Sequence, residues 1–217
     1  MSERAWIFAN GDLPDPSALR ALIAPGDRLI AADGGLRHLR RLGLTPHVLV
    51  GDLDSVDPAD LPALRTAGVQ VERFPREKDE TDLELAVFSA LRAGCRWLRI
   101  AAALGGRLDQ TLGNLFLLAL PALAEVDARL EDGREEVFLI RGRAEIHGRA
   151  GDIVSLLALG GEARGVTTTA LRYPLRGETL YLERTRGISN VMLGDTAAVE
   201  LEGGSLICIH TRISIDV

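Results

Sequence analysis

The pair of aspartates Asp52 and Asp54 has the spacing of a metal-binding motif, since the two lie one residue apart directly after an apolar run. Two carboxylates this close repel each other unless a cation or hydrogen-bond donors offset the repulsion. Magnesium prefers one or two carboxylates together with waters and phosphate oxygens. The pair therefore predicts a magnesium site, and the alternative is a solvated acidic turn.

A second acidic segment surrounds Lys78, the only lysine of the chain. Asp79 and Asp82 follow it three residues apart, at the predicted start of a helix, where amide groups also favour bound phosphate. Thr81 and Glu84 satisfy the capping-box pattern, so a well-made helix start is the structural interpretation of the same residues. The compact charge of Lys78 suits a phosphate oxygen, with a solvated surface position as the alternative.

Further polar clusters also follow predicted strands. They are Asn10-Gly11-Asp12, Asp33-Gly34-Gly35 and Gly105-Gly106-Arg107-Leu108-Asp109-Gln110. Taken singly, each has a plain explanation, because Asp and Gly are common in turns and Asp109 suits a helix N-cap. The carboxyl ends of parallel strands open onto one edge of a sheet, where such folds bind ligands. We therefore expect one crevice to hold all of these clusters.

The elements that must position these residues alternate between strand and helix patterns in the first part of the chain, which is typical of a parallel sheet with crossover helices. The predicted strands are Ala5–Ala9, Arg28–Ala32, His47–Val50, Val69–Phe74 and Trp97–Ala103. The predicted helices are Pro16–Ile23, Leu36–Leu42, Pro58–Ala67, Thr81–Ala93 and Asp109–Leu120.

After about residue 135 the pattern changes to short strand-like runs separated by glycines, which predicts an antiparallel sandwich or barrel. These runs are Glu136–Arg141, Ile153–Leu159, Thr179–Glu183, Ala197–Leu201 and Ser205–His210. The fold class expected is thus α/β, with an N-terminal Rossmann-like parallel sheet over residues 1–135 and a C-terminal antiparallel β-sandwich over 136–217. Thr167–Thr169 fits an exposed edge strand.

The composition of the chain limits the partners that we expect it to bind and the compartment in which we expect it to work. The formal charge of −6 and a pI near 5.3 argue against a broad positive field for nucleic acid or an anionic membrane. The longest apolar run, Leu115 to Leu123, has the length of a buried helix and is too short to span a bilayer. Two distant cysteines, Cys95 and Cys208, indicate no disulfide framework and fit a reducing cytoplasm.

The ordered set of motifs resembles the thiamine pyrophosphokinase family across almost the whole chain. The clusters given above carry the resemblance, together with Gly187-Ile188-Ser189-Asn190 and Leu171-Arg172-Tyr173-Pro174-Leu175. No single motif is specific, but their order and spacing are. The one departure is Ala170, which stands where a glycine is usual.

The resemblance implies an enzyme that transfers the β,γ-diphosphate of ATP to thiamine with Mg²⁺, as a homodimer whose active sites lie between the subunits. Implied catalytic residues are Asp33, Asp52, Asp54, Asp79 and Asp82, and all of these but Asp33 would hold the metal. Implied ATP-binding residues are Asn10, Gly11, Asp33, Gly34, Lys78, Thr81, Arg107, Asp109 and Gln110. Ser189 and Asn190 would hold thiamine.

Two other functions compete with this one. Asp52-x-Asp54 after an apolar strand also fits a phosphatase of the haloacid dehalogenase type, although such an enzyme needs neither the Lys78 segment nor the β domain. A catalytically silent sensor of nucleotide or thiamine would keep the pocket without turnover. Release of inorganic phosphate without thiamine favours the first, and tight ATP binding without turnover favours the second.

Overall fold

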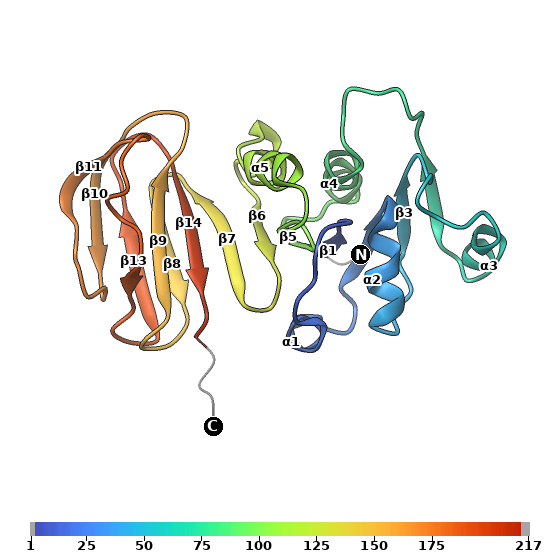
Figure 1. Ribbon diagram of the computed structural model, residues 1–217, viewed down its shortest axis with the longest axis horizontal. Coiled ribbons are helices and arrows are strands. Elements are labelled where there is room, and N and C mark those ends of the chain that lie inside the picture. The colour runs from blue at the N-terminus through green and yellow to red at the C-terminus, as the bar shows by residue number, and fades with distance from the viewer. Residues whose placement is uncertain (1–2, 214–217) are drawn as a thin grey trace. The chain divides into compact units, whose positions relative to one another are not determined.

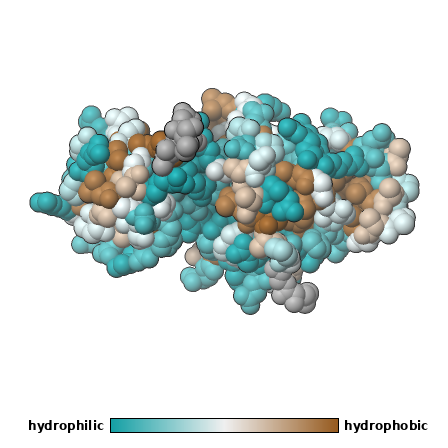
Figure 2. Space-filling view, turned by 90° about the horizontal axis from the view of Figure 1, so that it is seen from below, coloured by the Kyte–Doolittle hydropathy of each residue, from teal (hydrophilic) through white to brown (hydrophobic). Residues whose placement is uncertain are grey.

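A computed structural model describes residues 3–213 of the chain, which divides into two compact units, Met1–Gly133 and Arg134–Val217 (Figure 1). Each unit has its own buried cluster of hydrophobic side chains. Among the helices of the described residues, none is long and apolar enough to cross a membrane. Figure 2 shows hydrophobic residues in separate patches among hydrophilic ones on the face seen from below.

The first unit is built on a parallel sheet with the strand order β6-β5-β1-β2-β3-β4. Its strands are β1 (Arg4–Phe8), β2 (Arg28–Ala32), β3 (Val48–Gly51), β4 (Gln70–Arg73), β5 (Trp97–Ala101) and β6 (Asp127–Glu131). The chain runs outward from β1 to β4 and then returns to place β5 on the other side of β1. This reversal makes the carboxyl ends of β1 and β5 a topological switch point, where open α/β sheets bind ligands.

The helices of this unit are α1 (Pro16–Leu22), α2 (Leu36–Arg41), α3 (Asp60–Thr66), α4 (Asp82–Arg92) and α5 (Leu108–Leu117). α4 packs on β2 and β3 because Leu83, Ala86, Val87 and Ala90 recur at helical spacing and are buried. Thr81 caps α4, with its hydroxyl accepting a hydrogen bond from the Glu84 amide at 3.2 Å. The predicted capping box is therefore confirmed at its Thr end.

α5 differs from the buried helix predicted over Leu115 to Leu123. It ends at Leu117, and Leu118 and Leu123 beyond it are buried. The helix itself exposes Leu108, Leu112 and Phe116, at 71%, 43% and 56% of their surface. Because these residues are four apart, they form one apolar stripe along α5.

The second unit contains two antiparallel sheets, with the orders β12-β9-β14-β7 and β11-β10-β13-β8. The strands are β7 (Glu135–Ile140), β8 (Arg143–His147), β9 (Ile153–Ala158), β10 (Ala163–Thr169), β11 (Arg176–Leu180), β12 (Asn190–Val191), β13 (Thr196–Glu200) and β14 (Leu206–Thr211). Both sheets contribute to one core, including Ile140 and Leu206 from the first and Ile146 and Val199 from the second. The fold class predicted from the sequence is confirmed.

Thr167–Thr169 is not an exposed edge strand. It belongs to β10, which pairs with β11 on one side and β13 on the other. The Thr168 side chain is buried, and its hydroxyl accepts a hydrogen bond from the Leu175 amide at 2.9 Å. The buried hydroxyl is thus satisfied, which lets a polar residue occupy an interior strand.

Candidate active site

Three carboxylates converge at the carboxyl edge of the parallel sheet. Asp33 follows β2, Asp52 follows β3, and Asp82 opens α4. One carboxylate oxygen of each lies within 4.8 Å of the others. Asp33 is 7% exposed, and its Oδ1 is buried without a hydrogen-bond partner among the described residues. Such an arrangement of hard oxygen donors is suited to a divalent cation.

The backbone around these carboxylates takes conformations that few residues tolerate. Gly51, the last residue of β3, has φ of +145°. A Cβ placed on it would lie 3.0 Å from Asp33 Cβ and 3.1 Å from Asp82 Cγ. Asp33 itself has φ of +45°. A left-handed residue that is not glycine costs free energy and occurs preferentially at functional sites.

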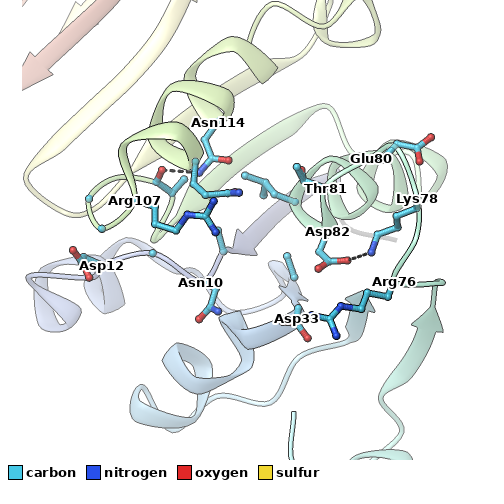
Figure 3. A pocket seen from close by; sticks show the side chains of 18 residues that line it. Asn10, Asp12, Asp33, Arg76, Lys78, Glu80, Thr81, Asp82, Arg107 and Asn114 are labelled. Atoms are coloured by element: carbon cyan, nitrogen blue, oxygen red, sulfur yellow. Dashed lines mark hydrogen bonds and ion pairs between the residues drawn. The ribbon is translucent and has the colours of Figure 1, made fainter. Parts of the chain in front are cut away.

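Lys78 is the cation paired with this group. Its ammonium lies 3.0 Å from Asp82 Oδ1 and 4.0 Å from Asp52 Oδ2, and its side chain is 12% exposed (Figure 3). Burial raises the pKa of the Asp82 carboxyl, and the nearby charges of Asp33 and Asp52 raise it further, against the opposing effect of Lys78. One ammonium therefore does not compensate the three acids.

The other two predicted metal ligands lie outside the group of three. Asp54 is not in this group although it lies one residue from Asp52, and Leu53 between them has φ of +68°. The Asp54 side chain is 51% exposed and lies 3.8 Å from Arg76. Asp79 is exposed and precedes the first turn of α4 rather than sharing a helix face with Asp82.

A cavity of about 530 Å³ lies beside the carboxylates (Figure 3). Its lining comes from the ends of β1, β2 and β5 and from the starts of α4 and α5. Predicted site residues that line it are Asn10, Gly11, Asp33, Lys78, Thr81, Asp82, Arg107 and Gln110. Gly34, Asp52, Asp54, Asp79 and Asp109 are not among the residues that line it.

The loop after β1 is held against its neighbours by backbone contacts. Gly11 donates to the Ala102 carbonyl at 2.8 Å, and a Cβ on Gly11 would lie 2.5 Å from that oxygen. The Arg37 guanidinium donates to the carbonyls of Asn10 and Gly11 at 2.8 and 2.9 Å. Gly34 lies so close that a Cβ there would meet the Asn10 side chain at 2.5 Å. Glycines at these positions thus allow the loop to approach β2 and β5.

Arg107 and Asp109 form a two-contact ion pair at the start of α5. The Arg107 Nε donates to Asp109 Oδ1 at 3.1 Å, and a second guanidinium nitrogen contacts Oδ2. This pairing holds the pKa of the Asp109 carboxyl below its ordinary value. Arg107 occupies the N-cap position of α5, and Asp109 lies in its first turn.

In the second unit the two predicted thiamine-binding residues differ in their surroundings. Ser189 is exposed, with φ of +59°, and its amide donates to Ser155 Oγ at 3.0 Å. Asn190 is 5% exposed, and its side chain bonds the Tyr173 amide at 2.9 Å and the Tyr173 carbonyl at 2.7 Å. The Asn190 side chain therefore stabilises the backbone conformation at Tyr173.

Four polar or charged side chains that the sequence interpretation did not assign also line the cavity: Asp12, Arg76, Glu80 and Asn114. Asn114 is buried on α5 and donates to the Ala103 carbonyl at 2.8 Å. Arg76 could have been found from its place two residues before Lys78 in the same loop. For Asn114 no local signal existed, because a single Asn within an apolar helix has no motif.

Comparison with known proteins places both halves of the chain in one family. Residues 19–128 match the model of the thiamin pyrophosphokinase catalytic domain, and residues 143–207 match that of the thiamin pyrophosphokinase vitamin B1 binding domain. The thiamine pyrophosphokinase of Bacillus subtilis is 28% identical over 84% of this chain and 86% of its own length. Thiamine pyrophosphokinase 1 of Oryza sativa subsp. japonica is 24% identical over 79% of this chain and 69% of its own.

Solved structures agree in fold. The thiamine pyrophosphokinase crystal structure from Bacillus subtilis superposes with a TM-score of 0.86, at 25% identity, over 97% of this chain and 100% of that one. The yeast thiamin pyrophosphokinase structure has a TM-score of 0.76 at 16% identity, over 98% and 87%. Since the two family models together cover most of the sequence, this chain belongs to the thiamin pyrophosphokinase family.

Proposed function

We propose that this chain transfers the β,γ-diphosphate of ATP to the hydroxyl of thiamine, giving thiamine diphosphate and AMP, at the carboxyl edge of its parallel sheet. The observation that carries the proposal is the convergence of Asp33, Asp52 and Asp82 beside the cavity. Membership of the thiamin pyrophosphokinase family supplies the reaction.

The residues present fit a magnesium ion. Three carboxylates offer oxygens within 4.8 Å of one another, and the buried Asp33 Oδ1 has no hydrogen-bond partner among the described residues. Asp33, Asp52 and Asp82 would hold the ion, and waters and phosphate oxygens would complete its shell. When bound, the ion would neutralise phosphate charge. This set replaces the one expected from the sequence by adding Asp33 and leaving Asp54 and Asp79 outside.

The chain's own residues would bind and orient the nucleotide. Asn10, Gly11, Thr81 and Gln110 would surround it, since all four line the cavity, and Lys78 and Arg107 add positive charge to the same lining. In the transfer, the thiamine oxygen would form a bond to the β-phosphorus and give up its proton to a carboxylate of the site, while the bond from that phosphorus to the oxygen of AMP breaks. Catalysis in such a site comes mainly from positioning and from charge stabilisation. Ser189, on an exposed left-handed turn, is our candidate contact to thiamine. The buried Asn190 beside it would hold that turn in position through its hydrogen bonds to the Tyr173 backbone.

We further propose that the chain works as a homodimer. The support is the apolar stripe of Leu108, Leu112 and Phe116 on α5, because contiguous exposed apolar surface commonly marks an interface. Phe116→Asp should then yield a monomer in light scattering. The native protein running as a monomer at the same concentration would end this part of the proposal.

The test of the activity is to incubate the protein with ATP, magnesium chloride and thiamine and to follow AMP and thiamine diphosphate by chromatography. Equimolar formation of both products, abolished by EDTA, is the expected result. Formation of ADP or inorganic phosphate without thiamine diphosphate would instead assign the site to a phosphatase. ATP binding without any product would assign it to a sensor.

A further inference from the structure

We propose that Arg76 contacts the diphosphate that is transferred, and that it is the main cationic side chain for this group. Three cationic side chains line the cavity: Arg76, Lys78 and Arg107. A polyphosphate binds most favourably to a cation that loses few existing ion pairs and hydrogen bonds on binding it. The present partners of these three side chains therefore indicate which of them binds the phosphates. The inference rests on the proposed function, since it names the ligand as ATP.

Lys78 already has partners. Its ammonium lies 3.0 Å from Asp82 Oδ1 and donates to the Pro75 carbonyl at 3.1 Å, while Asp52 Oδ2 lies 4.0 Å away. Its side chain is almost enclosed. To reach a phosphate, this ammonium would have to leave at least one partly buried carboxylate without its partner, which is costly. Lys78 therefore serves chiefly as a counter-ion within the acidic group.

Arg107 also has a partner, although both side chains of this pair are mostly exposed. It contacts both oxygens of Asp109, and this bidentate geometry is the most favourable one available to a guanidinium. The pair lies at the start of α5, whereas Asp33 and Asp52 follow β2 and β3 and Asp82 opens α4. Binding a phosphate with both prongs of the fork would require Arg107 to release Asp109.

Arg76 is differently placed. Its side chain is 83% exposed, and its contact with Asp54 is long, at 3.8 Å. Figure 3 shows it extending from the loop before α4 toward Asp33, at the edge of the carboxylate group. Arg76 can thus meet a phosphate beside this group without breaking a short ion pair. The planar fork of Arg suits two phosphate oxygens at once, which a lysine cannot match.

This placement makes Arg76 specific for the phosphates beyond the first. A nucleoside monophosphate carries no β- or γ-phosphate, so its binding should not depend on Arg76. A nucleoside triphosphate, and the transition state of the transfer, should both depend on it. Charge-assisted hydrogen bonds of this kind correspond to a change of about 10- to 100-fold in affinity.

The experiment compares four proteins by calorimetry in magnesium: the native chain, Arg76→Ala, Arg76→Lys and Arg73→Ala. Arg73 is the matched control because it is exposed on β4, three residues away, and does not line the cavity. The probes are α,β-methylene-ATP, which resists the transfer, and AMP. We expect Arg76→Ala to weaken the triphosphate about 10- to 100-fold and to leave AMP unchanged. Arg76→Lys should recover part of the loss, and Arg73→Ala should behave as the native chain.

Two outcomes would overturn the inference: equal losses for AMP and the triphosphate, which would indicate a structural defect, or an Arg76→Ala variant that binds like Arg73→Ala. Turnover separates this inference from the proposed function. If the native protein forms no thiamine diphosphate but Arg76→Ala still loses only triphosphate affinity, the reaction assignment fails and the role of Arg76 stands.

Discussion

At the scale of single residues, the site is organised around an excess of negative charge. Asp52 and Asp82 share one ammonium, that of Lys78, and the Oδ1 of the neighbouring Asp33 has no donor among the described residues. Like charges held this close destabilise the fold unless a cation joins them. The same excess of negative charge favours binding of a hard divalent ion that also binds phosphate. The charge cluster therefore lowers the stability of the folded chain without the ion and favours binding of the ion.

The first prediction separates the two members of the Asp-x-Asp pair. Asp52→Asn should lower kcat/KM by about 10² to 10³, because Asp52 belongs to the group of three. Asp54→Asn should cost much less, since the Asp54 side chain is half exposed and lies outside the group of three. Steady-state kinetics at saturating magnesium makes the comparison, with circular dichroism to show that both variants are folded. Equal losses in the two variants would place Asp54 in the metal shell after all.

The second prediction concerns pH and the metal-free protein. The pKa of Asp82 is raised above its ordinary value of 3.8 in the folded state. Its protonated form therefore contributes stability that is fully present below 3.8 and is lost as pH rises through the folded pKa. Asp82→Asn cannot lose this contribution. In EDTA, the free energy of unfolding of Asp82→Asn should thus increase relative to that of the native chain as pH rises from about 4 to 7.

Urea unfolding at a series of pH values measures this difference. Asp79→Asn is the control, because Asp79 is exposed in the same loop and should follow the native curve. Saturating magnesium and nucleotide should reverse the order at neutral pH by stabilising only the native chain. Parallel curves for Asp82→Asn and the native chain would mean that burial of Asp82 carries no cost.

Site residues in motifs with a local signature could be predicted from the sequence, whereas those whose position depends on the fold could not. Asp52, Lys78 and Asp82 stand in motifs with local signatures, and the structure brings them together. Asp33 was expected as a catalytic and ATP-binding residue but not as a metal ligand, because its place beside Asp52 and Asp82 depends on the fold and not on a local motif. Asp54 lies outside the group of three, and the residue between it and Asp52, Leu53, is left-handed, a conformation of which its residue type gives no sign.

At the scale of elements, the site depends on how closely loops and strand ends approach each other. Gly51 closes β3 at the point where Asp33 and Asp82 meet, with no room for a Cβ. Gly51→Ala should lower the free energy of unfolding by about 1–3 kcal/mol through its backbone conformation and the crowding. It should also weaken magnesium binding, because the added methyl group separates the two carboxylates.

The variant Gly43→Ala separates the effect of the backbone conformation on stability from the effect of crowding on magnesium binding. Gly43 also has a positive φ, of +66°, but a Cβ there meets nothing within 4 Å. This variant should lose stability by about 1–2 kcal/mol and keep its magnesium affinity. Thermal unfolding and Mn²⁺ titration, with Mn²⁺ as a spectroscopic substitute, measure both quantities. Native affinity in Gly51→Ala would show that the carboxylates do not depend on this close approach.

The elements themselves were largely predictable, because most are defined by local patterns. The alternation of apolar runs with capped helices gave the parallel sheet, and the observed bounds of β1, β2 and α4 lie within one residue of those expected at each end. Strand order was not predictable in the second unit. β10 contains three threonines and looked like an edge, yet it lies between β11 and β13, because cross-strand pairing is decided by distant residues.

At the scale of the whole molecule, the chain has two compact units and one buried cysteine in each. Cys95 precedes β5 in the first unit and Cys208 lies on β14 in the second, and both are fully buried. Neither forms a disulfide. Burial also raises the pKa of the Cys95 thiol, which reduces its reactive thiolate form. Each thiol should therefore react only when its surroundings open.

The last prediction uses these thiols to ask whether the units open separately. A ligand confined to the first unit stabilises that unit by about 2.7 kcal/mol at a hundred times its Kd, which corresponds to a roughly 100-fold smaller open population. With magnesium and α,β-methylene-ATP, labelling of Cys95 should slow by about that factor, while labelling of Cys208 should keep its rate. Mass spectrometry of the two cysteine peptides from the native chain measures both rates in one sample, without substitutions. Equal slowing at both thiols would instead show that the two cores unfold as one cooperative structure, so that nucleotide bound at the first unit also stabilises the second.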